Sequence, residues 1–514
     1  MGRGFTVLDG AVLLAYLLGT TALGLKLGGR QKDAKDYFVA SHAIPWWGIL
    51  LSVVASETSA LTFISIPGLA YAGNLGFLQV VAGYIIGRIV VAYVLLPRYF
   101  AGELVTAYAL FETRFGPATR RFTSIVFMAT RAVADSVRIF ATAIPVALIL
   151  GEVVPRQYLM PAAILVLGLL TVVYTWKGGM RAVVWTEMIQ AGVYVTGGIA
   201  ALVLLGASVD GGWGTILATA GSAGKLVAID WYTGFDRPHT VFAGLLGGAF
   251  LAMGSHGADQ LIVQRLLAST GLRDAQRALI GSGLVVFVQF ALFLMVGVGL
   301  FVYYGGKAFP AGDQIFPTFI LERMPPGLLG LILAAIVAAT MSTHSATINA
   351  LAATTTHDIY LPLSGASADD PKTLRMGKLF ALVWGVGLTF GALLYPQQGA
   401  PVVVVALSIQ SFTHGGLVGG FALALLWTRA TQRDAILGMS VGIATMAVIV
   451  FAKLLITWAP SLAPTLGGLA TIAWPWYVLI GTTITLAAGI LSSLTHPAPM
   501  PAALHTTNET EIRA

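Results

Sequence analysis

Residues 54–63 read VASETSALTF, and this polar stretch lies in the middle of an apolar run over about residues 46–71. The six residues after Val54 are all small or polar, and Ser and Thr hydroxyls compete with helical backbone for hydrogen bonds. Interrupted helix within a membrane is tolerated where it lines a cavity, and its freed carbonyls suit a cation. The stretch therefore predicts an ion or solute site inside a membrane protein. A packing face rich in hydroxyls is the alternative interpretation.

The rest of the chain has the composition of a membrane protein. Of its 514 residues, 57% are hydrophobic and 10% are charged, whereas soluble domains are about a quarter charged. The apolar residues form about 13 stretches long enough to cross a bilayer. Backbone groups in lipid must pair within each segment, so we expect an all-α polytopic fold. The lipid bilayer is thus the expected surrounding partner.

The placement of lysine and arginine predicts the orientation of the chain. Basic residues gather in alternate loops, beginning with Lys26, Arg30, Lys32 and Lys35 after the first stretch. The positive-inside rule then puts the N-terminus outside and the C-terminus in the cytoplasm, with the protein in the plasma membrane, or inner membrane of a bacterium. Because these residues lie in short loops and not on one face, we expect no nucleic-acid partner.

A second polar stretch, residues 339–347, reads ATMSTHSAT within another apolar run. Sodium is a hard cation and, like calcium and magnesium, prefers oxygen ligands. The hydroxyls of Ser342 and Thr343 and the carbonyl of Ala339 offer three, and the carbonyls of Ala55 and Thr58 would complete about five. Alternatively, the hydroxyls bond back to their own helix.

Five groups of residues, in chain order, resemble motifs of the sodium/solute symporter family. They are Asp36-Tyr37-Phe38 with Trp46-Trp47, the run from Ser59 to Phe63 with Pro67-Gly68, Lys177-Gly178-Gly179-Met180 with Gln190, Asp259-Gln260 with Gln264-Arg265, and Ser342-Thr343 with Asp358-Ile359-Tyr360. The resemblance covers about residues 5–455 and implies a LeuT-type 5+5 inverted repeat with one extra N-terminal and two extra C-terminal helices.

The resemblance also implies where cations bind. Its sodium lies between the first and eighth core helices, and the matching ligands are Ala55, Thr58, Ala339, Ser342 and Thr343. A second cation in some members uses positions that correspond to Glu187 and Ser345. This chain departs from that pattern because Glu187 stands where an aspartate is usual and Ala346 lacks a hydroxyl.

We expect one transporter domain over residues 1–514, with two repeats whose first helices are both interrupted. In the second repeat, Gly247-Gly248 and the run from Gly254 to Gly257 predict the interruption, and such a pair of broken segments points to a transporter site. The expected parts are an extra helix and loop (6–45), the first repeat (46–206), the second repeat (239–427), two extra helices (428–494) and a cytoplasmic tail (495–514).

Charged residues within one apolar stretch suggest the substrate. Arg131, Asp135 and Arg138 are spaced to share one helix face, and a guanidinium matches a carboxylate well. Arg138 is therefore expected to bind an anionic substrate. A structural ion-pair network with Glu57 or Glu187 is the alternative. The further candidate substrate residues are Ser59, Thr62, Gln79, His256 and Gln410.

These features together predict a secondary active transporter that couples sodium to a small organic solute, and a carboxylate-bearing anion is the expected class. The alternatives are a proton-coupled or uncoupled carrier of a neutral sugar or amino acid, and a transporter-like sensor. The chain has no HExxH motif, nucleophile elbow or cysteine, so we do not expect an enzyme. Sodium is the only expected cofactor, and no obligate protein partner is evident.

Overall fold

A computed structural model describes residues 5–497, apart from residues 30, 58–59, 103, 151–154, 311 and 396–401. The described residues are helical and include no strand; Ile44 and Ser269 form an isolated parallel bridge. This confirms the predicted all-α class, which follows from the need of backbone groups in lipid to pair within their own segment.

The described chain consists of α-helices joined by loops and by short π and 3₁₀ segments. The α-helices are α1 (Val7–Gly28), α2 (Ala34–Val39), α3 (Trp46–Glu57), α4 (Ala60–Ala72), α5 (Phe77–Val90), α6 (Leu96–Ala101), α7 (Ala109–Phe115), α8 (Pro117–Leu150), α9 (Leu159–Ser208), α10 (Gly212–Ser222), α11 (Gly248–Met253), α12 (Gln260–Leu267), α13 (Leu272–Tyr303), α14 (Ile315–Arg323), α15 (Leu328–Thr354), α16 (Leu361–Ser364), α17 (Pro371–Leu393), α18 (Val402–Leu426), α19 (Gln432–Val450), α20 (Ala452–Trp458), α21 (Ala463–Leu466) and α22 (Trp476–Leu494).

Eight of the described helical segments are long and apolar enough to cross a membrane. One of them, α9, is 50 residues long but changes direction at Gly179, where φ is 58° and ψ is −156°. It therefore contains two of the apolar stretches, one on either side of the Lys177-Gly178-Gly179 motif. The count of about 13 spans stays a prediction, because several other candidate spans are divided into shorter helices.

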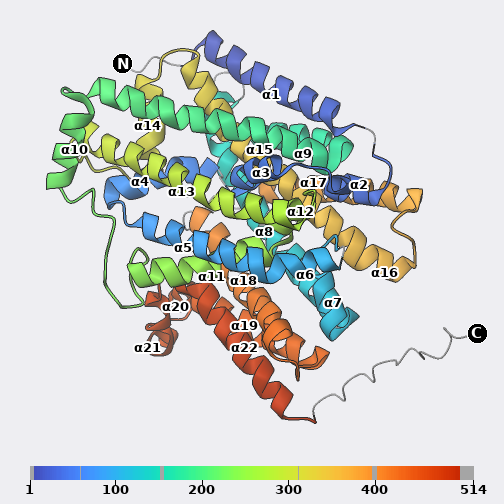
Figure 1. The fold of residues 1–514 in the computed structure, drawn as a ribbon. Helices are drawn as coiled ribbons and strands as arrows, with labels where there is room; N and C mark the ends of the chain where they lie inside the picture. The colour runs from blue at the N-terminus through green and yellow to red at the C-terminus, as the bar shows by residue number, and fades with distance from the viewer. Residues whose placement is uncertain are drawn as a thin grey trace, which may run out of the picture.

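Helix α15 is buried beside the long helices α1, α8, α9 and α17, which lie around it in Figure 1. It packs against α3, α4, α8 and α9, and nearly all of its described side chains are buried. At one edge, α1 lies against α9 and α15; at the opposite edge, α18, α19 and α22 pack together. The hydroxyl-rich stretch of α15 is thus enclosed by the helices that carry the other polar motifs.

The interruption predicted for the second repeat is present next to the run from Gly254 to Gly257, which lies in a π segment, and not at Gly247 and Gly248. Gly247 and Gly248 have helical torsions, and the chain leaves the helix at Asp259 (φ −93°, ψ 119°), between the π segment η5 (Gly254–Ala258) and α12. Gly248 serves helix packing instead: a Cβ on it would lie 2.5 Å from the carbonyl oxygen of Val80 on α5. Asp259 ends the segment because its side chain caps α12 by accepting from the Leu261 amide at 2.9 Å.

Candidate functional site

The C-terminal end of α3 is tied to the second repeat through Glu57. Its carboxylate accepts a hydrogen bond from Arg88 of α5 and lies 3.5 Å from Nε2 of His256 in η5. Arg88 also donates to Ser282 of α13 at 3.0 Å. Thr58 and Ser59, which follow Glu57, lie outside the described residues, so the interruption predicted there stays a prediction. Glu57 is the partner of Arg88 and not of Arg138.

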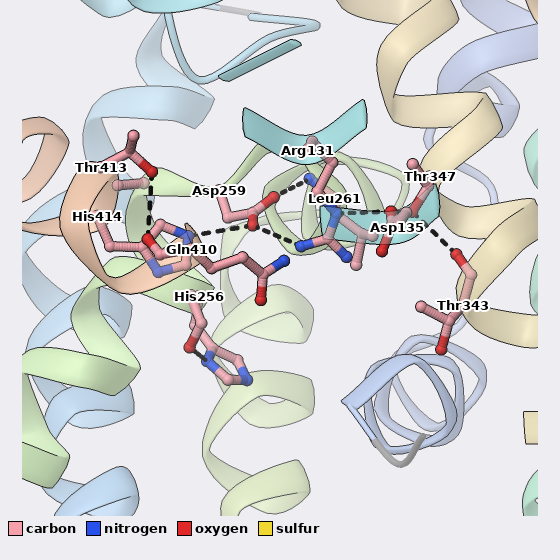
Figure 2. A network of polar contacts seen from close by, with 12 residues as sticks. Arg131, Asp135, His256, Asp259, Leu261, Thr343, Thr347, Gln410, Thr413 and His414 are labelled. Carbon is pink, nitrogen blue, oxygen red and sulfur yellow. Dashed lines mark hydrogen bonds and ion pairs between the residues drawn. The ribbon is translucent and has the colours of Figure 1, made fainter. Parts of the chain in front are cut away.

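Asp259 joins three helices at the interruption of the second repeat (Figure 2). Its Oδ2 accepts from Arg131 of α8 at 3.0 Å and lies 3.3 Å from Nε2 of His414 on α18. Arg131 also donates to Asp135 at 2.9 Å, and Asp135 accepts from the Thr347 hydroxyl of α15. All these side chains are buried. A continuous polar chain therefore runs from α18 through the helix break to α15.

Arg131 and Arg138 have different surroundings although they share a face of α8. Arg131 binds two carboxylates, whereas Nη2 of Arg138 donates to the neutral amide oxygen of Gln410 at 2.7 Å. Nη1 of Arg138 lies 3.8 Å from a carboxylate oxygen of Asp135. The other oxygen of that carboxylate already accepts a hydrogen bond from Arg131. A guanidinium carries five N–H donors, and the hydrogen bond to Gln410 uses one of those of Arg138 among the described residues.

Gln410 provides a further donor beside Arg138. Because its Oε1 accepts from Arg138, its buried Nε2 is left without a hydrogen-bond partner among the described atoms. A buried donor without a partner is costly, and an acceptor group bound beside it would remove that cost. The side chains of Arg138 and Gln410 together suit a carboxylate.

The predicted excess of positive charge on this face is not what the structure has. The sequence offered two arginines and one aspartate, but Asp259, 128 residues away from Arg131, brings a second carboxylate to the network. Arg131 and Arg138 are thus balanced by Asp135 and Asp259. A net positive charge is therefore not evidence for an anionic ligand. The evidence is the arrangement of hydrogen-bond donors at Arg138 and Gln410.

A second buried cluster surrounds Glu187 of α9. Its carboxylate is 2.6 Å from Nη2 of Arg265 on α12 and accepts from Ser52, Ser56 and Ser342. Glu187 and Arg265 are both fully buried. The predicted second cation position therefore holds a carboxylate that is already paired with Arg265. Ser345, its other predicted ligand, donates to the carbonyl of Ser342 at 3.0 Å.

Of the residues predicted to hold sodium, Ala55 lies in α3, and Ser342 and Thr343 lie in α15, which packs against α3. Ala55 and Ser342 are fully buried and Thr343 is 5% exposed; Thr58 and the side chain of Ala339 lie outside the description. Thr340, Ser345 and Thr347 bond back to carbonyls of their own helix. Ser342 instead points to Glu187 at 3.3 Å, so the back-bonding alternative does not apply to its hydroxyl.

The donor set suits a hard, monovalent cation. It consists of hydroxyl and carbonyl oxygens with no charged ligand, and oxygen is the atom that such cations prefer. Among the described residues, no group of three or more His, Cys, Asp or Glu could hold a metal ion. Sodium therefore fits this place better than a transition metal does.

The remaining predicted substrate residues are spread over two regions. Gln79 of α5 donates to the carbonyls of Gly76 and His239 and accepts from the Asp230 amide, so it ties α5 to the loop after α10. His256 belongs to the Glu57 cluster, with Nδ1 2.8 Å from the Ser255 hydroxyl. Thr62 is half-buried in α4. Among these candidates, Arg138 and Gln410 are joined by a hydrogen bond.

Sequence reasoning did not identify Arg88, Asp259 or Arg265 as site residues. Each had a usable signal, because each is a charged residue inside or next to an apolar stretch, where charge is costly. Their partners could not be read from the sequence, since they lie on other helices.

Comparison with known proteins decides the family of the chain. The profile of the sodium:solute symporter family matches residues 37–442. The chain belongs to this family. It is therefore a sodium-coupled transporter and not an enzyme, and the predicted sodium cofactor and small-molecule substrate are confirmed at that level.

Relatives within the sodium:solute symporter family include proteins named for sialic acid. The chain is 30% identical to the sodium/sialic acid symporter SiaT of Proteus mirabilis over 85% of this chain and 88% of that one. It is 31% identical to the sodium/sialic acid symporter NanT of Aliivibrio fischeri over 86% and 88%. A substrate-bound, outward-open structure of a sodium-coupled sialic acid symporter superposes with a TM-score of 0.82 at 28% identity, covering 96% of this chain and 99% of that one. The likeness confirms the LeuT-type fold.

Proposed function

We propose that the solute carried by this sodium-coupled symporter bears a carboxylate, and that Arg138 and Gln410 bind it. The observation that carries the proposal is the donor arrangement at these two residues. Arg138 is bonded to a neutral amide, and that bond leaves the Gln410 Nε2 donor without a partner among the described atoms. A carboxylate supplies acceptors for both groups. Sialic acid, named for two relatives, is a sugar acid with such a group.

We also propose that Ala55, Thr58, Ala339, Ser342 and Thr343 hold the sodium ion. When bound, the ion would supply positive charge and bridge the first and eighth core helices. The chain's own part is to present neutral oxygens: Ser342 is kept in place by Glu187, whose charge Arg265 balances. A second cation at Glu187 and Ser345 remains a proposal, and it requires the carboxylate to release Arg265.

The remaining substrate candidates, Ser59, Thr62, Gln79 and His256, are proposed to complete the solute site when the helices move. Gln79 would then have to leave its three backbone partners. We further propose that residues 46–206 and 239–427 are the two repeats of a single transporter domain. The N-terminus would lie outside and the C-terminus in the cytoplasm of a plasma membrane, as the basic loops predict.

Uptake by proteoliposomes tests the carboxylate proposal. The purified chain would be given labelled sialic acid, a short monocarboxylate or a neutral sugar, each with a sodium gradient or with choline instead. Sodium-driven uptake of a carboxylate, and none of the neutral sugar, is the expected result. Arg138→Lys should then raise KM about tenfold or more, because a lysine cannot make the planar two-pronged contact.

Two further variants separate binding from folding. Gln410→Glu keeps the size of the side chain but sets a carboxylate against Arg138, so it should abolish carboxylate uptake while the protein still folds. Arg237→Lys, at an exposed site, is the matched control and should transport normally. Unchanged KM in Arg138→Lys, or uptake of the neutral sugar alone, would refute the proposal.

A further inference from the structure

A cavity of about 490 Å³ opens where the end of α1 meets the turn within α9 and the side of α17. It is lined by Leu25, Gly29, Gln31, Lys177 and Lys378. None of these residues belongs to the proposed sodium or carboxylate sites, so the role of this cavity is independent of the substrate that the protein carries.

Close glycine contacts shape this cavity. A Cβ on Gly28 would lie 2.4 Å from Cα of Gly178, so only glycine lets the end of α1 approach the α9 turn that carries Lys177. Gly29 then turns the chain with φ at 61°, a region that favours glycine. Gln31 donates to the carbonyls of Gly28 and Gly29 at 3.0 and 2.9 Å. The Gln31 amide therefore caps the carbonyls at the end of α1. This hydrogen bonding reduces the negative partial charge that these carbonyl oxygens present to the cavity.

The cavity presents two lysines without carboxylate partners. Nζ of Lys378 donates to Oε1 of Gln31 at 2.8 Å and lies 5.6 Å from the ring centre of Tyr37. Lys177 is exposed. Neither forms an ion pair with a carboxylate of the described chain, and Asp36 pairs with Arg181 at 3.5 Å instead. The cavity therefore has the charge of an anion site.

An apolar stripe continues from the cavity along α1. Leu14 and Leu18 are each 56% exposed, and Leu25, which lines the cavity, is 36% exposed. Their spacings of four and seven residues put them on one helix face. Since α1 is long and apolar enough to span a membrane, its end lies at the depth of lipid headgroups. A basic cavity joined to an apolar stripe matches the two parts of a phospholipid.

We propose that this cavity binds the phosphate of an anionic phospholipid through Lys177 and Lys378, with its acyl chains along Leu25, Leu18 and Leu14. Basic pockets between membrane helices bind lipid headgroups by this kind of charge pairing. Inorganic phosphate shares the headgroup chemistry but leaves the leucines uncovered. The lipid is therefore the occupant that satisfies both features.

Native mass spectrometry of the full-length protein tests the proposal. The purified protein in detergent is titrated with phosphatidylglycerol or with neutral phosphatidylcholine of the same chains. Two lysines at a membrane surface predict about 30-fold tighter binding of the anionic lipid. The variant Lys177→Gln/Lys378→Gln should lose this preference. Its control, Lys372→Gln/Arg375→Gln, removes two exposed charges of α17 outside the cavity and should keep it.

A single variant guards against misfolding of the double one. Lys177 is exposed, so Lys177→Glu should fold and still lower the preference for phosphatidylglycerol at least tenfold. Competition with millimolar inorganic phosphate separates the two sources of the anion. Equal binding of both lipids, an unchanged preference in either lysine variant, or displacement of the lipid by inorganic phosphate would overturn the proposal.

Discussion

The buried pair of Glu187 and Arg265 should be the most costly contact to break by a single substitution near the proposed sodium site. Both side chains are fully buried, and they are joined at 2.6 Å. Removing one partner of such a pair leaves an uncompensated buried charge and costs about 3–5 kcal/mol. In Arg265→Met, Glu187 still accepts from Ser56 at 3.2 Å and from Ser342 at 3.3 Å. We therefore expect a loss near the lower end of that range.

A double-mutant cycle measures this contact. Unfolding in mixed detergent micelles would be followed for Arg265→Met, Glu187→Leu and the double variant. The double variant should lose less stability than the sum of the single ones, because replacing both buried charges by apolar groups is often neutral. Ser342 should bind sodium less well in every variant that lacks Glu187, since its hydroxyl loses its partner.

The control is the exposed pair of Arg237 and Asp230. These side chains are 3.8 Å apart and 59% and 42% exposed, so Arg237→Met should cost at most about 1 kcal/mol. If Arg265→Met is no more destabilising than Arg237→Met, or if the cycle gives no coupling, the role assigned to the buried pair is wrong.

Other parts of the molecule give three further predictions. Ser342→Ala and Thr343→Ala should each raise the sodium concentration for half-maximal uptake; wild-type sodium dependence in both would contradict the proposed ion site. Gly179→Ala should lower the midpoint of thermal unfolding, because φ is 58° and the new Cβ would lie 2.6 Å from the Tyr37 carbonyl oxygen. The control Gly19→Ala adds a Cβ in open space and should leave that midpoint unchanged. The carbonyl of Pro497 and the carboxylate of Asp434 raise the pKa of His496 above 6.5. The contact of His496 with Asp434 of α19 is therefore fully stabilising below pH 6.5, and it weakens as the pH rises through the folded-state pKa. Hydrogen exchange at the end of α22, corrected for its intrinsic pH dependence, should show this protection in the wild type; an equal profile in His496→Gln would exclude it.

The polar stretches at residues 54–63 and 339–347 led to the sodium site that we propose. Hydroxyls inside apolar runs are unusual enough to mark a site, and their motifs match the family that the comparison confirms. The structure brings the helices that carry them into contact, as α15 packs on α3 and α4. Arg138 was also recognisable, because a charge within an apolar stretch is costly. Its contact with Gln410, 272 residues away, was not.

Of the two glycine-rich segments that predicted the second interruption, the run from Gly254 to Gly257 lies next to it and Gly247-Gly248 does not. Gly247 and Gly248 suggested a break, but glycine serves equally well where two helices approach closely, as Gly248 does beside Val80. The break lies at Asp259, whose side chain caps the next helix. The sequence could not distinguish the two uses of glycine, since the distance between α11 and α5 is a property of the packed molecule.

The sequence by itself determined that this chain is a polytopic helical membrane protein of the sodium symporter type. Hydropathy and short motifs are local properties, and the bilayer forces apolar stretches to become helices wherever they occur. Only the tertiary structure decided which charges are paired: Glu57 with Arg88, Asp259 with Arg131, and Glu187 with Arg265. These pairs form between different helices, so they depend on how each helix is rotated and placed against its neighbours. Hydropathy limits which face is buried but does not fix that rotation closely enough to name a partner.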